Sequence, residues 1–277
     1  MYSLEACEKE WDAVGRHGSR TERMERAKRW LPYYACLAER ERGKPFQLPD
    51  RDNDMVSALV QSGKLRDGDS VLDVGAGMGG YALELARHCK SVTALDASEP
   101  CLDVLCERAG HCGLDNISTV CGTWEEYSAP ERFDLVFSAM CPAICNTEEL
   151  RRMEAASADR CCLISVMRGS VDKHRRAMMA ELKVRPAGGM VTEAIHYYNA
   201  LYLMGRRPDV TCRTVERSHD ITEETLLTQY PVYFRIFGVS EQDSVAYLKN
   251  YLALHGDHGV LHEESAMNFA MITWKTV

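Results

Sequence analysis

Between residues 70 and 167 the sequence alternates short apolar runs with segments of helical periodicity, and this alternation restricts the possible folds most. The apolar runs predict buried strands, and the segments between them predict helices. Strands that alternate with helices form a parallel sheet with helices on both faces. The expected strands cover residues 71–74, 92–95, 117–121, 133–140 and 161–167, and the expected helices cover 81–86, 101–109 and a segment that begins at Thr147, whose hydroxyl is expected to cap it.

The regions on either side of this alternation are mostly helical in pattern. They contain expected helices at 4–14, 22–38, 55–60, 172–182 and 190–204, the last ending at Gly205. Two extended segments, 210–216 and 267–275, flank helices expected to begin near Thr222 and Ser240.

Composition and charge exclude several classes of protein. The 277 residues include 33 Lys and Arg against 41 Asp and Glu, a net charge of −8, which repels phosphate backbones, so nucleic acid is not expected as a partner. The most apolar stretch, 190–205, is interrupted by polar residues such as Glu193, so no membrane span is expected. Acidic residues near the start argue against a secretory signal and predict a cytoplasmic protein. Twelve cysteines without a C-x-x-C pair then indicate reduced thiols, and no metal site is expected.

The segment Asp73-Val74-Gly75-Ala76-Gly77-Met78-Gly79-Gly80 joins the first expected strand to the first helix of the alternation. Glycines are needed where a chain turns sharply and its backbone must approach a ligand closely, so this turn predicts a nucleotide-like ligand. Gly75, Gly77 and Gly80 also satisfy the G-x-G-x-x-G pattern of dinucleotide-binding proteins.

Asp73, two residues before the first glycine, changes that interpretation. It gives the form D-x-G-x-G-x-G, which resembles motif one of the class I S-adenosylmethionine (SAM)-dependent methyltransferases. The resemblance implies SAM as the cofactor, held by Asp73, Gly75, Gly77 and Gly79. It also assigns Asp96, which ends the second expected strand 21 residues after Gly75 and is followed by Ala97, to the ribose hydroxyls.

The resemblance assigns further positions around the cofactor. The segment after the third expected strand corresponds to the adenine site, where Thr123 stands nearest the aspartate common in the family and Trp124 either contacts adenine or packs under the sheet. Met140 begins the loop that would face the transferable methyl group. That loop is not of the N-P-P-Y type, which disfavours methylation of nucleic-acid bases by that route.

The family also completes the expected fold. It is α/β and doubly wound, with a seven-stranded, mostly parallel sheet whose last strand is antiparallel, as in Rossmann-like methyltransferases. Residues 1–52 are expected to form an N-terminal helical cap, and 53–277 the methyltransferase domain with a helical insertion at 169–207.

The acceptor site is expected among these additions and the Met140 loop. Tyr33, Tyr34, Cys141 and Pro142 are candidates for binding the acceptor. On the 190–204 helix, Thr192, His196 and Asn199 share one face, which points either to solvent or into a cavity; His196 and Tyr198 are the candidate catalytic residues, with His196 as a base. The arginines between residues 16 and 29 form either a solvated helix face or an anion site.

These observations predict an enzyme that transfers a methyl group from SAM to a small molecule by in-line displacement. Three alternatives stay open: methylation of a macromolecule such as RNA or protein, a nicotinamide-dependent oxidoreductase, and a SAM-binding protein that transfers no methyl group. The sequence does not identify the accepting atom, and it leaves the oligomeric state open.

Overall fold

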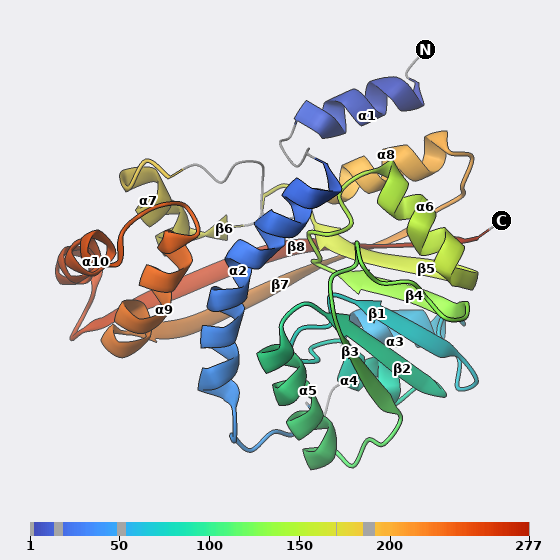
Figure 1. Ribbon diagram of the computed structural model, residues 1–277. Coiled ribbons are helices and arrows are strands. Elements are labelled where there is room, and N and C mark those ends of the chain that lie inside the picture. The colour runs from blue at the N-terminus through green and yellow to red at the C-terminus, as the bar shows by residue number, and fades with distance from the viewer. Residues whose placement is uncertain (1–2, 14–18, 49–53, 170, 185–191, 277) are drawn as a thin grey trace.

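The computed structural model describes residues 3–13, 19–48, 54–169, 171–184 and 192–276 (Figure 1). One eight-stranded sheet forms its centre, with the order β3-β2-β1-β4-β5-β8-β6, and β7 also pairs with β8. The strands are β1 (Ser70–Val74), β2 (Ser91–Asp96), β3 (Ile117–Cys121), β4 (Phe133–Ala139), β5 (Ser157–Val166), β6 (Val171–Asp172), β7 (Asp209–Thr222) and β8 (Val260–Lys275).

The direction of the strands confirms the predicted sheet. β1 to β5 pair in parallel, and β8 runs antiparallel between β5 and β7, with Cys162 opposite Thr273 and Thr211 opposite Met271. β6, which has two residues, pairs with β8 at Ala266 and Ser265, beyond the end of the β5 pairing. Among the residues that the structure describes, β6 is the one addition to the expected seven strands.

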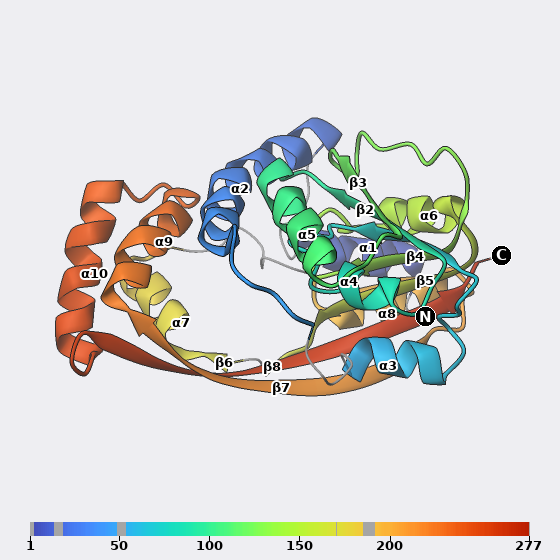
Figure 2. The same ribbon diagram turned by 90° about the horizontal axis from the view of Figure 1, so that it is seen from below.

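Helices cover both faces of the sheet (Figure 2). Leu72 packs in a core cluster with residues of α1, α6 and α8, whereas its neighbour Val71 packs in a second cluster with residues of α3, α4 and α5. This alternation follows from the period of two in a strand. The helices are α1 (Leu4–Ala13), α2 (Arg20–Glu41), α3 (Asp54–Gln61), α4 (Ala82–Ala86), α5 (Glu99–His111), α6 (Thr147–Ala156), α7 (Lys173–Glu181), α8 (Ala194–Leu203), α9 (Glu223–Arg235) and α10 (Glu241–His255). No helix in these described segments is long and apolar enough to cross a membrane.

All three predicted helix starts are confirmed, because α6 begins at Thr147 and α9 and α10 begin directly after Thr222 and Ser240. The Thr222 and Ser240 side chains cap α9 and α10 by accepting from the backbone N–H groups three residues later. The prediction that Thr147 caps α6 was wrong. Asn146 has the extended backbone that a cap needs, and its Oδ1 accepts from Glu149 N at 2.9 Å. The Thr147 hydroxyl instead donates to Glu8 Oε1 of α1.

The far ends of β7 and β8 extend beyond the rest of the sheet and carry a third core cluster, formed mainly by α7, α9 and α10 (Figures 1 and 2). Both strands are longer than the predicted segments 210–216 and 267–275, because their pairing continues to Thr222 opposite Val260. Most β7 side chains are exposed, so the apolar pattern that marks a strand is missing there.

The two helices of the predicted cap (residues 1–52) pack on different parts of the structure, and so do the two helices of the predicted insertion (169–207). α1 contacts α8, where the Trp11 and Tyr197 rings lie 5.2 Å apart, whereas α2 lies between α5 and α9. Within the expected insertion, α7 packs in the third cluster and α8 in the first. The division into domains 1–52 and 53–277 stays a prediction.

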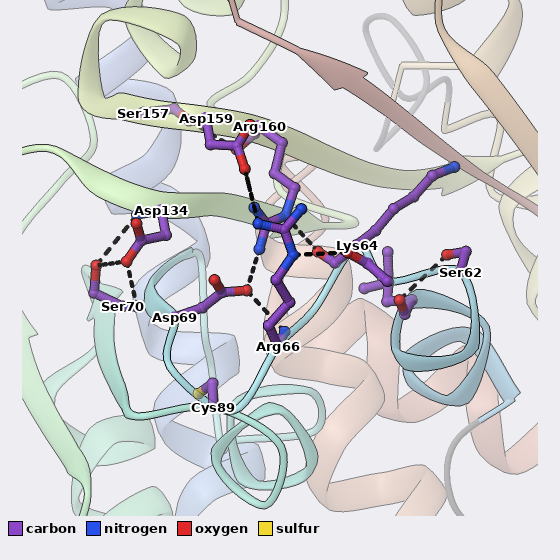
Figure 3. A network of polar contacts seen from close by, with 12 residues as sticks. Ser62, Lys64, Arg66, Asp69, Ser70, Cys89, Asp134, Ser157, Asp159 and Arg160 are labelled. Atoms are coloured by element: carbon purple, nitrogen blue, oxygen red, sulfur yellow. Dashed lines mark hydrogen bonds and ion pairs between the residues drawn. The ribbon is translucent and has the colours of Figure 1, made fainter.

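A polar network joins the amino ends of β1, β4 and β5 (Figure 3). Arg160 forms ion pairs with Asp69 and Asp159, and its Nε donates to the Lys64 carbonyl at 2.6 Å. Asp134 accepts from the backbone N–H of Ser70 at 2.8 Å. These contacts tie the strands at the edge opposite their carboxyl ends.

Candidate cofactor site

A cavity of about 950 Å³ lies at the carboxyl ends of β1, β2 and β4. This is where ligands bind in open α/β sheets. Residues of α2, and the two residues that follow α9, line its other side. Of the residues predicted from sequence, the lining includes Tyr34, Gly75, Gly77, Asp96, Ala97, Thr123, Trp124, Met140, Cys141 and Pro142.

The glycines of the turn after β1 have different surroundings. Gly75, Gly77 and Gly79 all have positive φ angles, which other residues rarely adopt. A Cβ on Gly75 would lie 2.7 Å from Cys141 Sγ, and one on Gly79 would lie 3.0 Å from leucine side chains. A Cβ on Gly77 would have no neighbour within 4 Å. Gly75 therefore allows the Cys141 loop to approach, Gly79 allows close packing, and Gly77 leaves space at the cavity.

Asp96 connects the turn to β2. Its Oδ2 accepts from Gly77 N and its Oδ1 from Ser98 N, both at 2.8 Å. Burial raises the pKa of this carboxyl, although the backbone hydrogen bonds act in the opposite direction. Because Asp96 lines the cavity while its oxygens hold the turn, it can both shape the site and accept hydrogen bonds from a ligand.

Asp73 lies outside the cavity lining. It is 2% exposed, at the centre of the sheet beneath the turn. Burial, and secondly the nearby Asp96, raise its pKa to about 8. The carboxyl is therefore mostly protonated at neutral pH. A contact between Asp73 and the cofactor stays a prediction.

The segment after β4 is strained where it reaches the cavity. Met140 has a φ of 56°, although its N–H still donates to the Ile164 carbonyl at 2.9 Å. A residue other than glycine in this region costs energy and often marks a functional site. Burial raises the pKa of the adjacent Cys141 thiol to about 12, so this thiol is neutral at pH 7.

Trp124 belongs to the core and also lines the cavity. It is 4% exposed and packs in the first core cluster. The Arg152 guanidinium lies 4.5 Å from the centre of its ring, and Arg152 Nη2 donates to the Trp124 carbonyl at 2.8 Å. Trp124 therefore packs in the core, as one interpretation predicted, and also borders the cavity. Its contact with adenine stays a prediction. Thr123 donates from its hydroxyl to Glu126 Oε2 at 2.8 Å.

The surroundings of Arg23 match neither interpretation of the arginines between residues 16 and 29. Arg23 is neither a solvated side chain nor a vacant anion site, because its Nη2 lies 2.7 Å from Glu149 Oε1 and its Nε 3.8 Å from Glu125 Oε1. Both carboxylates are buried. Arg23 thus fastens the start of α2 to α6 and to the loop after β3. Sequence reasoning missed Glu125 and Glu149; the one signal for Arg23 is its spacing of seven and eleven residues from Trp30 and Tyr34 on α2.

Five residues, which we call the α2–α9 wall, form the apolar and aromatic part of the remaining side of the cavity: Trp30, Leu31, Tyr34, Ile236 and Phe237. The first turns of α2 line the rest of that side with Thr21, Glu22, Arg23, Glu25, Arg26, Ala27 and Arg29. The Trp30 ring lies 5.9 Å from Tyr34 and 6.0 Å from Phe237. Burial, and secondly the nearby Cys141, raise the pKa of Tyr34. Ile236 and Phe237 were not predicted, because they are far from the motifs in sequence.

Three predicted acceptor or catalytic residues lie elsewhere. Tyr33 packs on Tyr233, with ring centres 5.4 Å apart, in the third cluster. His196 on α8 stacks on Trp11 at 6.2 Å, and burial lowers its pKa. Tyr198 stacks on Tyr202. None of the three belongs to the cavity lining, and their predicted roles stay untested.

Comparison with known proteins agrees with this geometry. A family model described as a methyltransferase domain matches residues 71–161. A solved structure of a candidate methyltransferase from Bacillus halodurans is 16% identical, with a TM-score of 0.51, over 81% of this chain and 99% of that one. No curated protein sequence matches the chain.

Two further structures contain the cofactor or its product. Coclaurine N-methyltransferase bound to N-methylheliamine and S-adenosylhomocysteine (SAH) is 14% identical over 98% of this chain and 94% of that one, with a TM-score of 0.49. A complex of DhpI with SAM and HEP is 20% identical over 66% of this chain and 91% of that one, with a TM-score of 0.45. Residues 71–161 therefore match a methyltransferase domain, and the sheet of this chain has the Rossmann-like α/β fold of the Bacillus halodurans structure.

Proposed function

We propose that this protein is a SAM-dependent methyltransferase that acts on a small molecule held between the Met140 loop and the α2–α9 wall. The observation that carries the proposal is that one cavity of about 950 Å³ is lined by both the glycine turn and that wall. Pockets for small ligands and cofactors measure about 300–1,000 Å³. A cavity of this size can hold a nucleoside cofactor and a compact acceptor together.

The residues present fit SAM. The open space at Gly77 admits a ligand close to the backbone, and Asp96 offers a carboxylate for the ribose hydroxyls. Trp124 and Thr123 would border adenine, and Ala97 and Met140 complete this part of the lining. When bound, SAM supplies a methyl group that its sulfonium has already activated toward a nucleophile.

The chain's own residues then have to orient the acceptor and exclude water. Alignment of two reactants can supply about 7–11 kcal/mol of a barrier. Trp30, Leu31 and Phe237 offer apolar surface for this purpose. The raised pKa of Tyr34 keeps its hydroxyl protonated, so Tyr34 would donate a hydrogen bond rather than act as a base. The proposal assigns no step to His196 or Tyr198.

A macromolecular acceptor is the second candidate, and two observations disfavour it. The arginines that line the cavity, Arg23, Arg26 and Arg29, alternate along α2 with Glu22 and Glu25, and the wall beside them is mostly apolar, whereas a nucleic acid needs an accessible basic face. The net charge of −8 also opposes a polyanion.

Two measurements test the proposal. Calorimetric titration should show binding of SAM and SAH and no binding of NAD or NADP. Incubation of the protein with methyl-labelled SAM and a fractionated cell extract should then place the label in the small-molecule fraction. Label in the RNA or protein fraction alone would favour the macromolecular alternative.

A further inference from the structure

The α2–α9 wall has a distinct chemical character. Its five side chains are three aromatic rings and two aliphatic groups, and their polar groups are the Tyr34 hydroxyl and the Trp30 indole N–H. The rings of Trp30, Tyr34 and Phe237 lie close together, with Trp30 about 6 Å from each of the other two. Such a surface binds flat apolar molecules through area and ring contacts.

The cavity offers few groups that could remove a proton from an acceptor. Its lining, as far as the structure describes it, contains no histidine or lysine, and its three arginines, Arg23, Arg26 and Arg29, stay protonated and are balanced by four carboxyl groups. Asp96 is engaged by two backbone N–H groups, and Glu125 faces Arg23 near the start of α2. Glu22 and Glu25 also line the cavity, but Glu22 accepts from the Ser19 backbone N–H at 2.7 Å and Glu25 pairs with Lys28 at 3.0 Å. Tyr34 and Cys141 both have raised pKa values and stay protonated at neutral pH.

We propose that the acceptor is a flat, uncharged nitrogen heterocycle that is methylated on its ring nitrogen; this rests on the proposed function. Such a nitrogen has a free lone pair at neutral pH. That lone pair forms the new N–CH₃ bond while the electrons of the breaking S–CH₃ bond return to sulfur, so the positive charge moves to the ring and no proton is released. An alcohol, phenol or thiol would have to lose a proton to the site.

The aromatic wall also suits the product of this reaction. The methylated heterocycle is a flat cation, and aromatic faces attract cations within about 6 Å of the ring centre. The same faces attract a sulfonium, so the charge stays in a favourable environment as it moves. Both the aromatic wall and the scarcity of bases therefore favour the same class of acceptor.

The first test compares two acceptors of similar bicyclic shape, isoquinoline and 2-naphthol, of which only the naphthol must lose a proton. With methyl-labelled SAM, isoquinoline should be methylated at least about tenfold faster than 2-naphthol, and calorimetry with SAH present should show that it binds. Equal or faster transfer to the naphthol would overturn the proposal. So would a protein that binds SAM but neither binds nor methylates isoquinoline. A protein that fails to bind SAM would instead refute the proposed function.

The second test measures binding alone, with N-methylisoquinolinium as the probe and SAH present. Phe237→Leu keeps apolar volume and removes one aromatic face, so affinity for the probe should fall about three- to tenfold while SAH affinity stays unchanged. Tyr202→Leu is the matched control, because Tyr202 is 57% exposed and outside the cavity lining. Equal affinity for the probe in both variants would contradict the aromatic wall as the cation site.

Discussion

The backbone N–H of Gly77 donates a hydrogen bond to Asp96 Oδ2 at 2.8 Å, which ties the turn after β1 to the end of β2. Gly77 is the glycine of this turn that leaves open space at the cavity, and the Asp96 carboxylate lines the same cavity. The backbone conformation of the turn at Gly77 and the position of the Asp96 carboxylate therefore depend on each other.

Replacement of Asp96 should test this dependence. Asp96→Ala removes both the acceptor for Gly77 and the carboxylate offered to ribose, and a hydrogen bond to a charged group contributes about 1.5–3 kcal/mol. We expect SAH affinity to fall roughly ten- to a hundredfold. Asp103→Ala, on the exposed side of α5, is the control for calorimetry. Unchanged affinity in a folded Asp96→Ala protein would remove Asp96 from the site.

Asp73 should make stability depend on pH. Its pKa is raised to about 8 in the folded protein, above its value of 3.8 in an unfolded chain, so the folded state holds the extra proton between these values. The stability contributed by this proton is complete below pH 4 and is lost as the pH rises through 8. Asp73→Asn removes the titration, so the variant should gain stability relative to the wild type by roughly 1 kcal/mol per pH unit between pH 5 and 8.

Urea unfolding of both proteins at pH 5, 6.5 and 8 measures that difference. Parallel pH profiles for the two proteins would show that the buried carboxyl titrates near its ordinary pKa.

The contact between Gly75 and Cys141 predicts a difference between two glycine substitutions. Gly75 and Gly113 both have positive φ, 80° and 66°, so alanine at either position costs about 1 kcal/mol in backbone strain. At Gly75 the new Cβ would also lie 2.7 Å from Cys141 Sγ, whereas at Gly113 it would meet nothing within 4 Å. Gly75→Ala should therefore lose about 1–3 kcal/mol more stability than Gly113→Ala in urea unfolding. Equal losses would mean that the Cys141 loop moves away without cost.

Arg23 should be important for the attachment of α2. Arg23→Met would leave the buried carboxylates of Glu125 and Glu149 with less compensation, and breaking a buried ion pair from one side costs about 3–5 kcal/mol. Because Arg152 still pairs with Glu149, we expect a loss toward the lower end of this range. Lys28→Met, on an exposed position of the same helix, should change the free energy of unfolding by less than about 0.5 kcal/mol. Similar values for both variants would contradict a structural role for Arg23.

The sequence predicts the sheet and the cofactor side of the site because both depend on local patterns. β3 has the predicted bounds of residues 117–121, and the glycine turn follows directly from a buried strand. Gly77 and Asp96 are near each other in space because parallel strands bring their carboxyl ends to one edge.

The acceptor side depends on contacts between distant segments, which a sequence pattern does not reveal. Phe237 reaches the cavity because the long β7 and β8 strands carry α9 to α2, and the exposed half of β7 has no strand periodicity. His196 was expected near the cavity from a polar face on α8. That helix packs on α1, where His196 stacks on Trp11.

A crystal structure with SAH bound tests the central claim most directly. It should show the ribose hydroxyls on Asp96, the adenine beside Trp124, and the sulfur opening toward Met140 and the α2–α9 wall. A sulfur atom that faces away from that wall, or SAH bound outside this cavity, would contradict the account.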